Sequence, residues 1–439
     1  MSAPGPSLSP LHRLWRLLPA ASRRALFARA TAWSAPRPDA VPPPMQGGLA
    51  VGGEIGRASG LGEVARLMGH ALRSLDVPTW LVDTGSAVPG EVPDAALAAE
   101  NARMGLTNSL RPGVPLALHV NAPMLPWALR TLPRGLLRGR RVVGCWTWEL
   151  PLVPESWRVG LDFVHEVWVP SRFTATAMAG LMENSPARAK PIRIVGYPLA
   201  ASPPVPSRLD RAAFGLPTEA VVVLVSFNLA SSFVRKNPLA AIAAFRRAFG
   251  PRADRVMVLK LLGTHAYPAD MAVLRAAAAD AGNIRIETRT LPPADSHALT
   301  ACADIVLSLH RAEGFGLLPA EAMLLGRAVV ATGWSGNMDY MDASTAALVD
   351  YRLVPASDPR GTYDLSGAVW AEPDVDAAAG HLVRLADDAA LRSALGRRAA
   401  VSAKDKLGAT SLDVALRGMG WDAMATRRAG CAAEGASGT

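Results

Sequence analysis

The chain has 439 residues, of which 50% are hydrophobic and 19% are charged; this length favours two domains and this composition argues against extensive disorder. No apolar run approaches the ~20 residues that a membrane-spanning helix needs. The three cysteines, Cys145, Cys302 and Cys431, lie far apart, so their spacing predicts neither a disulfide framework nor a zinc site. A protein of the reducing cytoplasm fits this cysteine usage.

Residues 1–46 carry much of the formal net charge of +9, because they contain six arginines and one acidic residue, Asp39. Arginines interrupt every apolar run, so the segment does not resemble a secretory signal. On a helix, one face would hold four apolar side chains, those of Leu11, Leu14, Trp15 and Leu18. This pattern predicts an interfacial helix on an anionic membrane; a helix packed on the protein and a disordered basic tail are the alternatives. Because the strongly basic part is confined to this segment, nucleic acid is not an expected partner.

After a proline-rich linker at residues 34–44, strands and helices alternate in two arrays that a second proline-rich break at 197–210 separates. Strands are expected at 47–51, 78–83, 114–120, 141–147, 165–169 and 192–196, and then at 220–227, 255–261, 283–287, 304–308 and 328–332. Helices are expected at 61–75, 171–181, 237–249, 292–302 and 318–325. The alternation predicts an α/β protein of two Rossmann-like, doubly wound domains, residues 47–203 and 204–409, that face a central cleft.

The stretch HRAEGFGLLPAEAMLLG, residues 310–326, follows an expected strand and leads into a helix. Its glycines and the helix start should present free backbone amides, which form an anion site together with the helix dipole. Two carboxylates, Glu313 and Glu321, flank these amides, and they suit a ligand that carries hydroxyl groups on either side of its phosphates. The pattern therefore predicts a nucleotide-sugar site; the alternative is that Glu321 only stabilises the first helical turn.

Three further patches follow expected strands. Arg235 and Lys236, in VRKNP, are suited to neutralise a diphosphate, although a solvated basic pair is the alternative. His119 ends another strand, and Trp148 and Glu149 follow a third; the tryptophan can stack on a sugar or lie in the core. The glycines of 47–67 do not form a clean GxGxxG, which disfavours a dinucleotide oxidoreductase.

The segments EGFGLLPAE and MLLGRAVVATGWSGNMDYM resemble the E-x7-E signature of retaining glycosyltransferases of family 4, which have the GT-B fold. WTWELPLVPESW and VRKNPLAAIAAF are similar to stretches of the family members that build bacterial polysaccharides. The resemblance covers about 47–425. It implies that residues 410–439 hold a helix that crosses back to the first domain, followed by a frayed tail.

The resemblance implies a role for each matching position. Glu313 would bind the donor sugar and Glu321 the ribose, while His119 would lie near the donor sugar. Arg235 and Lys236 would bind the diphosphate. The implied contacts through loop backbone are those of Gly60, Gly62, Gly314, Phe315, Gly316, Leu317 and Leu318. Ser335, Gly336 and Asn337 would form a loop near the cleft.

The implied activity is metal-independent, front-face hexosyl transfer with retention, and no cofactor or metal is expected. The donor would be of the GDP-mannose or UDP-glucose type. The acceptor would be a saccharide, preferably a lipid-linked oligosaccharide for surface polysaccharide, which suits a cytoplasmic protein peripheral to the inner face of the plasma membrane. A soluble small acceptor and a non-catalytic nucleotide-sugar-binding subunit are the alternatives.

Overall fold

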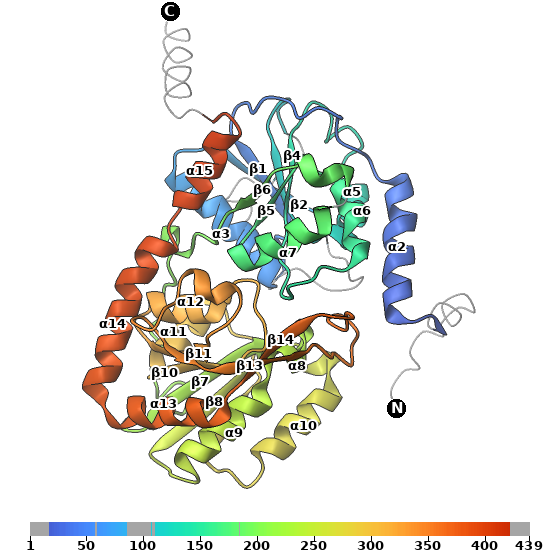
Figure 1. Ribbon diagram of the computed structural model, residues 1–439. Coiled ribbons are helices and arrows are strands. Elements are labelled where there is room, and N and C mark those ends of the chain that lie inside the picture. The colour runs from blue at the N-terminus through green and yellow to red at the C-terminus, as the bar shows by residue number, and fades with distance from the viewer. Residues whose placement is uncertain (1–16, 58, 86–106, 108–109, 184, 422–439) are drawn as a thin grey trace, which may run out of the picture.

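The computed structural model describes residues 17–57, 59–85, 107, 110–183 and 185–421. Two six-stranded parallel sheets form the centres of two domains that lie one above the other, each covered by helices (Figure 1). The predicted pair of doubly wound α/β domains is thus confirmed. The inner strands at 49–53, 221–228 and 255–262 are buried on both faces, which explains why they are largely apolar runs, whereas the outer strands at 79–83, 192–194 and 284–287 are only partly buried.

The first sheet has the strand order β2-β1-β3-β4-β5-β6. Its strands are β1 (Leu49–Gly53), β2 (Thr79–Asp83), β3 (Leu116–His119), β4 (Val142–Cys145), β5 (Glu166–Val169) and β6 (Ile192–Ile194). Its helices include α3 (Gly60–Ser74), α5 (Leu125–Thr131), α6 (Arg158–Leu161) and α7 (Arg172–Met182). The carboxyl ends of these strands face the second domain, where they place the segments after β3 and β4 at the domain boundary.

The second sheet has the order β12-β11-β10-β7-β8-β9. Its strands are β7 (Val221–Asn228), β8 (Arg255–Leu262), β9 (Ile284–Glu287), β10 (Ile305–Ser308), β11 (Ala328–Thr332) and β12 (Ala347–Val349). Its helices are α8 (Phe233–Lys236), α9 (Pro238–Phe249), α10 (Pro268–Ala278), α11 (Pro293–Cys302), α12 (Leu317–Leu324), α13 (Val375–Asp387) and α14 (Ala389–Lys406). Since β7 and β10 are neighbours, the loops that follow them meet at one edge of the sheet.

An antiparallel hairpin, β13 (Tyr351–Pro355) and β14 (Val369–Pro373), extends from the second domain. Its connecting loop, 356–368, carries Tyr363, which is buried in the first domain's core cluster together with Trp370. No part of the sequence pattern predicted this hairpin. Its loop closes one side of the boundary between the domains.

The chain returns to the first domain at its C-terminal end. Helix α14 runs along the side of the second domain, and α15 (Thr410–Gly418) lies against the first domain (Figure 1). Leu412 and Leu416 of α15 are fully buried in a cluster with Leu49 of β1 and Trp168 of β5. The first domain's core is therefore completed by the last described helix.

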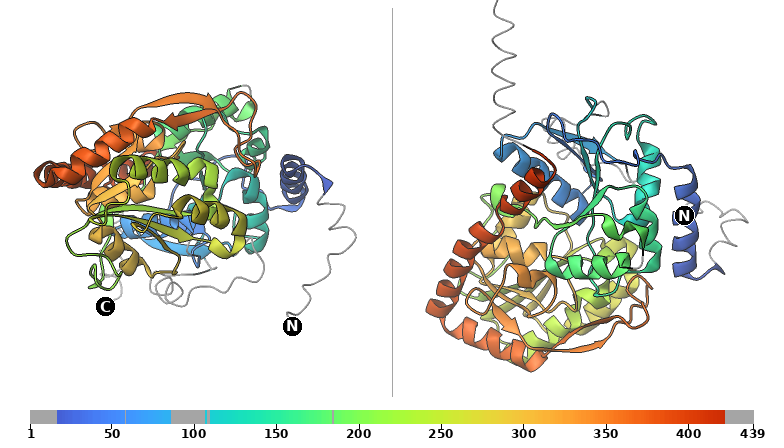
Figure 2. Two further views of the ribbon diagram at one scale, coloured as in Figure 1. Left: turned by 90° about the horizontal axis from the view of Figure 1, so that it is seen from below. Right: turned by 45° about the horizontal axis from the view of Figure 1, so that its top comes forward.

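Helix α2 (Ala20–Ser34) precedes β1 and stands on the outer side of the first domain, beside α5 and α6 (Figure 2). Phe27 packs on Trp127 with ring centroids 5.6 Å apart, and Ala28 is buried. Trp33, in contrast, is 91% exposed. Of the apolar face predicted for the N-terminal segment, only Leu18 is among the described residues; Leu11, Leu14 and Trp15 lie outside them. Among the described residues, no helix combines the length and hydropathy needed to cross a membrane.

Candidate active site

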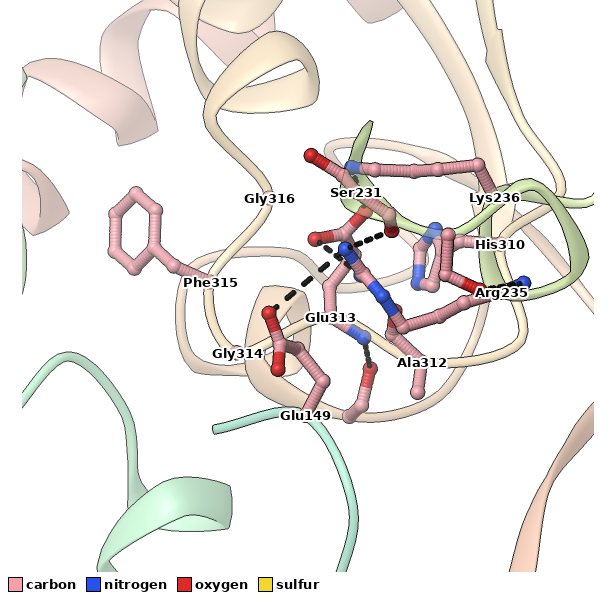
Figure 3. Close-up of polar contacts among 12 residues, drawn as sticks. Glu149, Ser231, Arg235, Lys236, His310, Ala312, Glu313, Gly314, Phe315 and Gly316 are labelled. Carbon is pink, nitrogen blue, oxygen red and sulfur yellow. Dashed lines mark hydrogen bonds and ion pairs between the residues drawn. The ribbon is translucent and has the colours of Figure 1, made fainter. Parts of the chain in front are cut away.

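Glu313 lies between two cations at the boundary of the domains. It follows β10, and Lys236 of α8 donates a hydrogen bond to its Oε1 atom, while Nη1 of Arg235 lies 3.2 Å from its Oε2 atom (Figure 3). The carboxylate and the guanidinium are both buried, whereas the Lys236 side chain keeps 22% of its exposure. The structure thus brings together residues from two motifs that are 77 positions apart in the chain.

The electrostatics of this cluster keep Glu313 ionised. Burial alone would raise the pKa of Glu313, but the charges of Lys236 and Arg235 outweigh this and lower it to about 2. Burial lowers the pKa of Lys236 from its ordinary value, and the Glu313 carboxylate opposes that shift. A salt bridge that is this buried is costly to break on one side, because the remaining charge is left unpaired.

The guanidinium group of Arg235 is held by contacts with the protein and is not left free to bind a phosphate. Its guanidinium donates to the carbonyl oxygen of Ala312 at 2.7 Å and to that of Ser231 at 2.9 Å. Its Nη2 atom also lies 3.8 Å from Oε1 of Glu149, and its guanidinium lies over the ring of Tyr363. In this arrangement Arg235 positions the loop that carries Glu313, and Lys236 is the more accessible cation.

A second loop, 335–337, fixes the backbone of Glu313. The amide of Glu313 donates to Oγ of Ser335 at 2.9 Å, and the amide of Gly336 donates to the Glu313 carbonyl at 2.9 Å. A Cβ atom on Gly336 would lie 2.1 Å from the carbonyl oxygen of Gly314, so only glycine allows this approach. Asn337 completes the support through a 3.1 Å contact between its Oδ1 atom and Nε2 of His310.

The turn 314–318 leads into α12 as an uncapped helix start. Gly316 has φ of +93°, a left-handed conformation that favours glycine, and Tyr340 donates to its carbonyl at 2.6 Å. No side chain of the described residues caps α12. A cavity of about 30 Å³ lies here, lined in part by Lys236, Glu313, Gly316, Leu317 and Leu318. Helix amides and an ammonium group around one small cavity form a site for an anion.

Phe315 differs from its neighbours in the turn. Its ring points away from the Glu313 cluster (Figure 3) and packs on Tyr197 of the first domain, with centroids 4.6 Å apart. Its contribution to an anion site is therefore limited to its backbone.

Glu321, one turn into α12, is partly buried, and its side chain has no hydrogen bond or ion pair among the described residues. Burial, reinforced by the charge of Glu63 on α3, raises its pKa to about 8. A carboxyl group in this position is available to bind hydroxyl groups of a ligand, and nothing in the described helix uses it as a cap.

The first-domain residues predicted for the site lie in two different settings. Gly60 and Gly62 form the start of α3, where Gly62 is closely packed: a Cβ atom there would lie 2.6 Å from the carbonyl oxygen of Glu54. His119 is 2% exposed, and its Nε2 atom lies 3.3 Å from the Met68 sulfur. Burial lowers the pKa of His119 to about 3, so its imidazole is neutral.

The structure does not place His119 in the Glu313 cluster. His119 lines a cavity of about 10 Å³ with Thr147 and Tyr197, and these two residues contact the 314–315 turn. His119 is therefore separated from the turn by one layer of side chains.

Several contacts join the two domains at the turn, and sequence reasoning missed them. Ser171 donates to the carbonyl of Gly314 at 2.7 Å. Tyr363 donates to Oε2 of Glu149 at 3.0 Å. The strand-end position drew attention to Glu149, but Tyr363 lies in a loop without a motif, so the sequence contained no signal for it.

The described residues contain no group of three or more His, Cys, Asp or Glu side chains placed to hold a metal ion. The acidic residues of DYMD have other contacts. Asp339 accepts from the backbone amide of Arg172, and Asp342 accepts from Ser344 and Lys406.

Comparisons with known proteins give a family match for part of the chain. Residues 227–388, less than half of the chain, match the family model described as glycosyl transferases group 1. No curated protein sequence matches the chain.

Similar solved structures cover most of the chain at low identity. The structure of Anabaena Alr3699/HepE in complex with UDP and glucose has a TM-score of 0.59 at 13% identity and covers 84% of this chain and 98% of its own. A glycosyltransferase from Rickettsia africae has a TM-score of 0.57 at 12% identity, covering 85% and 99%. A sucrose-phosphate synthase from Thermosynechococcus elongatus has a TM-score of 0.57 at 15% identity, covering 84% and 97%.

These matches establish the GT-B fold, as predicted. The family match runs from the end of β7 through α13, the part of the chain that supplies Lys236, Glu313 and α12. Together the fold and the family match support a glycosyltransferase.

Proposed function

We propose that the protein is a retaining hexosyltransferase that takes mannose or glucose from a nucleotide-diphosphate sugar without a metal ion. The proposal rests mainly on one observation: Glu313 forms a buried cluster with Lys236 beside the uncapped start of α12. The carboxylate is suited to sugar hydroxyl groups, and the ammonium group and helix amides are suited to the diphosphate. Because the Anabaena structure contains UDP and glucose, a UDP-glucose type of donor is the first to test, before a GDP-mannose type.

In the proposed reaction the bond between the anomeric carbon and the diphosphate oxygen breaks, and its electron pair leaves with the diphosphate. The acceptor oxygen forms the new bond on the same face of the sugar, and its proton passes to the departing phosphate oxygen. Lys236 and the amides of 314–318 stabilise the negative charge of the leaving group. Glu313 orients the donor sugar, Glu321 binds the ribose, and Arg235 holds the Glu313 loop and adds positive charge.

For the acceptor we propose a saccharide, preferably lipid-linked, in surface or exopolysaccharide synthesis at the cytoplasmic face of the membrane. The basic N-terminal segment, with six arginines and one acid in 1–46, supports contact with an anionic surface. A soluble acceptor is the second candidate.

Calorimetric titration with UDP, GDP, ADP and their sugar conjugates tests the donor class. Binding at 100 times the dissociation constant should stabilise the protein by about 2.7 kcal/mol, which a thermal-shift experiment detects. Lys236→Ala should weaken binding of the nucleotide that the panel identifies. Lys404→Ala, which changes an exposed lysine on α14, should leave that binding unchanged. NMR of the product reports the anomeric configuration, and chelator treatment should leave the rate unchanged. Absence of nucleotide binding would favour a non-catalytic role and contradict the proposal.

A further inference from the structure

A cavity of about 660 Å³ is lined in part by Glu149 and shares no lining residue with the anion site. Four segments of the chain form its walls: α2, the two segments that follow β3 and β4, and the 356–368 loop. Its volume is within the range of about 300–1,000 Å³ that is typical of small-ligand sites. None of the roles described above uses this cavity.

Aromatic rings make up much of its wall. Trp148 stacks on Tyr363 with centroids 5.3 Å apart and meets Trp157 edge to face at 5.2 Å. Phe27, which belongs to α2, also lines the cavity and packs on Trp127. Rings from both domains and from α2 thus form one apolar surface around the cavity. Trp148, Trp157 and Tyr363 are buried against one another, with 4% to 6% of each residue exposed, so the partly exposed ring of Phe27 is the one best placed to pack on the apolar C–H face of a sugar.

Polar groups are distributed among these rings, and several have unused capacity. Asn121 accepts from the amide of Thr147 through Oδ1 at 2.9 Å, and its side-chain nitrogen has no hydrogen bond within the described part of the chain. The Nε atom of Arg23 is buried without a hydrogen-bond partner there. Asp364 is exposed at the edge of the cavity. Against a hydrocarbon chain the Arg23 and Asn121 nitrogens would stay unsatisfied, whereas hydroxyl groups can accept from both.

Glu149 connects this cavity to the candidate donor site. Its Oε2 atom accepts from Tyr363. Its Oε1 atom lies 3.8 Å from Arg235, which in turn contacts Glu313 (Figure 3). A ligand in the cavity that donates a hydroxyl hydrogen to Glu149 would therefore lie beside Arg235, which contacts Glu313, the carboxylate proposed to bind the donor sugar. This is the position that an acceptor needs.

We propose that the cavity between α2 and the 356–368 loop binds the acceptor saccharide, with Phe27 as its outer wall and Glu149 as the residue that binds its hydroxyl group next to the donor. The inference rests on the proposed transfer reaction. It assigns an acceptor-selecting role to α2, an element that lies outside the family match and before the first sheet.

The test measures saccharide binding by calorimetry with maltose, cellobiose, lactose and mannobiose as probes. The protein is titrated alone and when saturated with the nucleotide that binds in the panel above. At least one disaccharide should bind. Phe27→Ala, which removes part of the cavity wall, and Ser156→Trp, which fills the cavity, should each lower the affinity for that disaccharide at least tenfold. Leu26→Ala is the matched control, because this neighbour on α2 is 47% exposed and does not line the cavity.

Two results would overturn the inference: binding that neither cavity variant weakens, or no binding of any disaccharide to protein that still binds its nucleotide. If one of the two variants fails to fold, its melting temperature will show this, and the other variant, at a different wall of the cavity, still tests the inference. Loss of all nucleotide binding would count against the transfer reaction instead, and the titrations without nucleotide would still decide whether the cavity binds saccharides.

Discussion

Glu313 illustrates how much the site depends on charge balance at a single residue. It is buried beside two cations, one of which, Arg235, is itself buried at 3% exposure. The burial of Glu313 and Arg235 is tolerable because their opposite charges compensate one another and because two backbone carbonyls accept from the guanidinium, whose Nε atom has no partner among the described residues. A ligand that enters must therefore exchange contacts with this cluster.

Glu313→Gln should reduce transfer by about 100-fold or more, because the amide cannot balance Lys236 or accept as strongly from sugar hydroxyls. Initial rates with saturating donor and acceptor measure the loss. Glu155→Gln, at a carboxylate whose side chain is 76% exposed, should leave the rate unchanged. Equal rates for wild type and Glu313→Gln would exclude the sugar-binding role.

Glu321 should make the stability of the protein depend on pH. Its pKa is raised from 4.5 to about 8 in the folded protein, so between these values the folded state binds more protons than the unfolded state. Stability due to this group therefore falls as pH rises through that window, by about 1–3 kcal/mol. Melting temperatures between pH 5 and pH 8 should fall more steeply for wild type than for Glu321→Gln. Parallel curves would show that the carboxyl group is not perturbed.

At the scale of elements, the start of α3 depends on close packing around one glycine. Ser59 caps the helix by accepting from the amide of Gly62 at 3.1 Å, and a Cβ atom at Gly62 would lie 2.6 Å from the carbonyl oxygen of Glu54 and 2.7 Å from that of Arg57. At Gly60, two residues earlier, a Cβ atom would meet no described atom within 4 Å. The two glycines thus have different reasons to be there.

Gly62→Ala should destabilise the protein by about 1–3 kcal/mol and reduce transfer, because its Cβ atom would displace the loop before α3. Gly60→Ala should be neutral or slightly stabilising, since alanine favours a helix over glycine. Thermal melts and initial rates of both variants decide this. The prediction is wrong if the two substitutions have the same effect.

The elements that sequence reasoning predicted are those with a strong local signal. Strands β7 and β8 are long, buried and largely apolar runs, and Pro238 and Pro293 mark helix starts. The hairpin β13–β14 lacks such a signal, since all five residues of β13 are at least partly exposed. The sequence could place Glu313, Arg235 and Lys236 at strand ends, but it could not show that Arg235 is buried against Tyr363, because that contact depends on tertiary structure.

At the scale of the molecule, the two domains share apolar clusters across their boundary. Ala312 and Tyr363 of the second domain belong to the first domain's cluster, and Val64 of α3 belongs to a cluster with Phe315 and Met323. In addition, α15 is part of the first domain although it follows the second in the chain. The domains are therefore joined at both the site and the crossover.

A chain that ends at residue 409 should lose the stability of the first domain, because Leu412, Leu416 and Met419 are buried and each contributes about 1.5–3 kcal/mol. A chain that ends at 421 retains all of α15 and should keep the first domain folded. Limited proteolysis, with the fragments mapped by mass spectrometry, would show cleavage within 49–194 only for the shorter chain. Equal resistance of both chains would show that α15 is dispensable.

The place of α15 also constrains how the protein is made. The strands of the first sheet leave the ribosome early, but Leu412 and Leu416, which cover Leu49 and Trp168, emerge more than 200 residues after β6. At about 5–20 residues per second, the nascent first domain waits for roughly 10–45 s with part of its apolar surface uncovered. The second domain, whose sheet and helices are contiguous from β7 to α14, can fold before the first is complete. For this chain, co-translational folding should run from the later domain to the earlier one, and a chaperone that shields β1 and β5 during this interval would raise the yield.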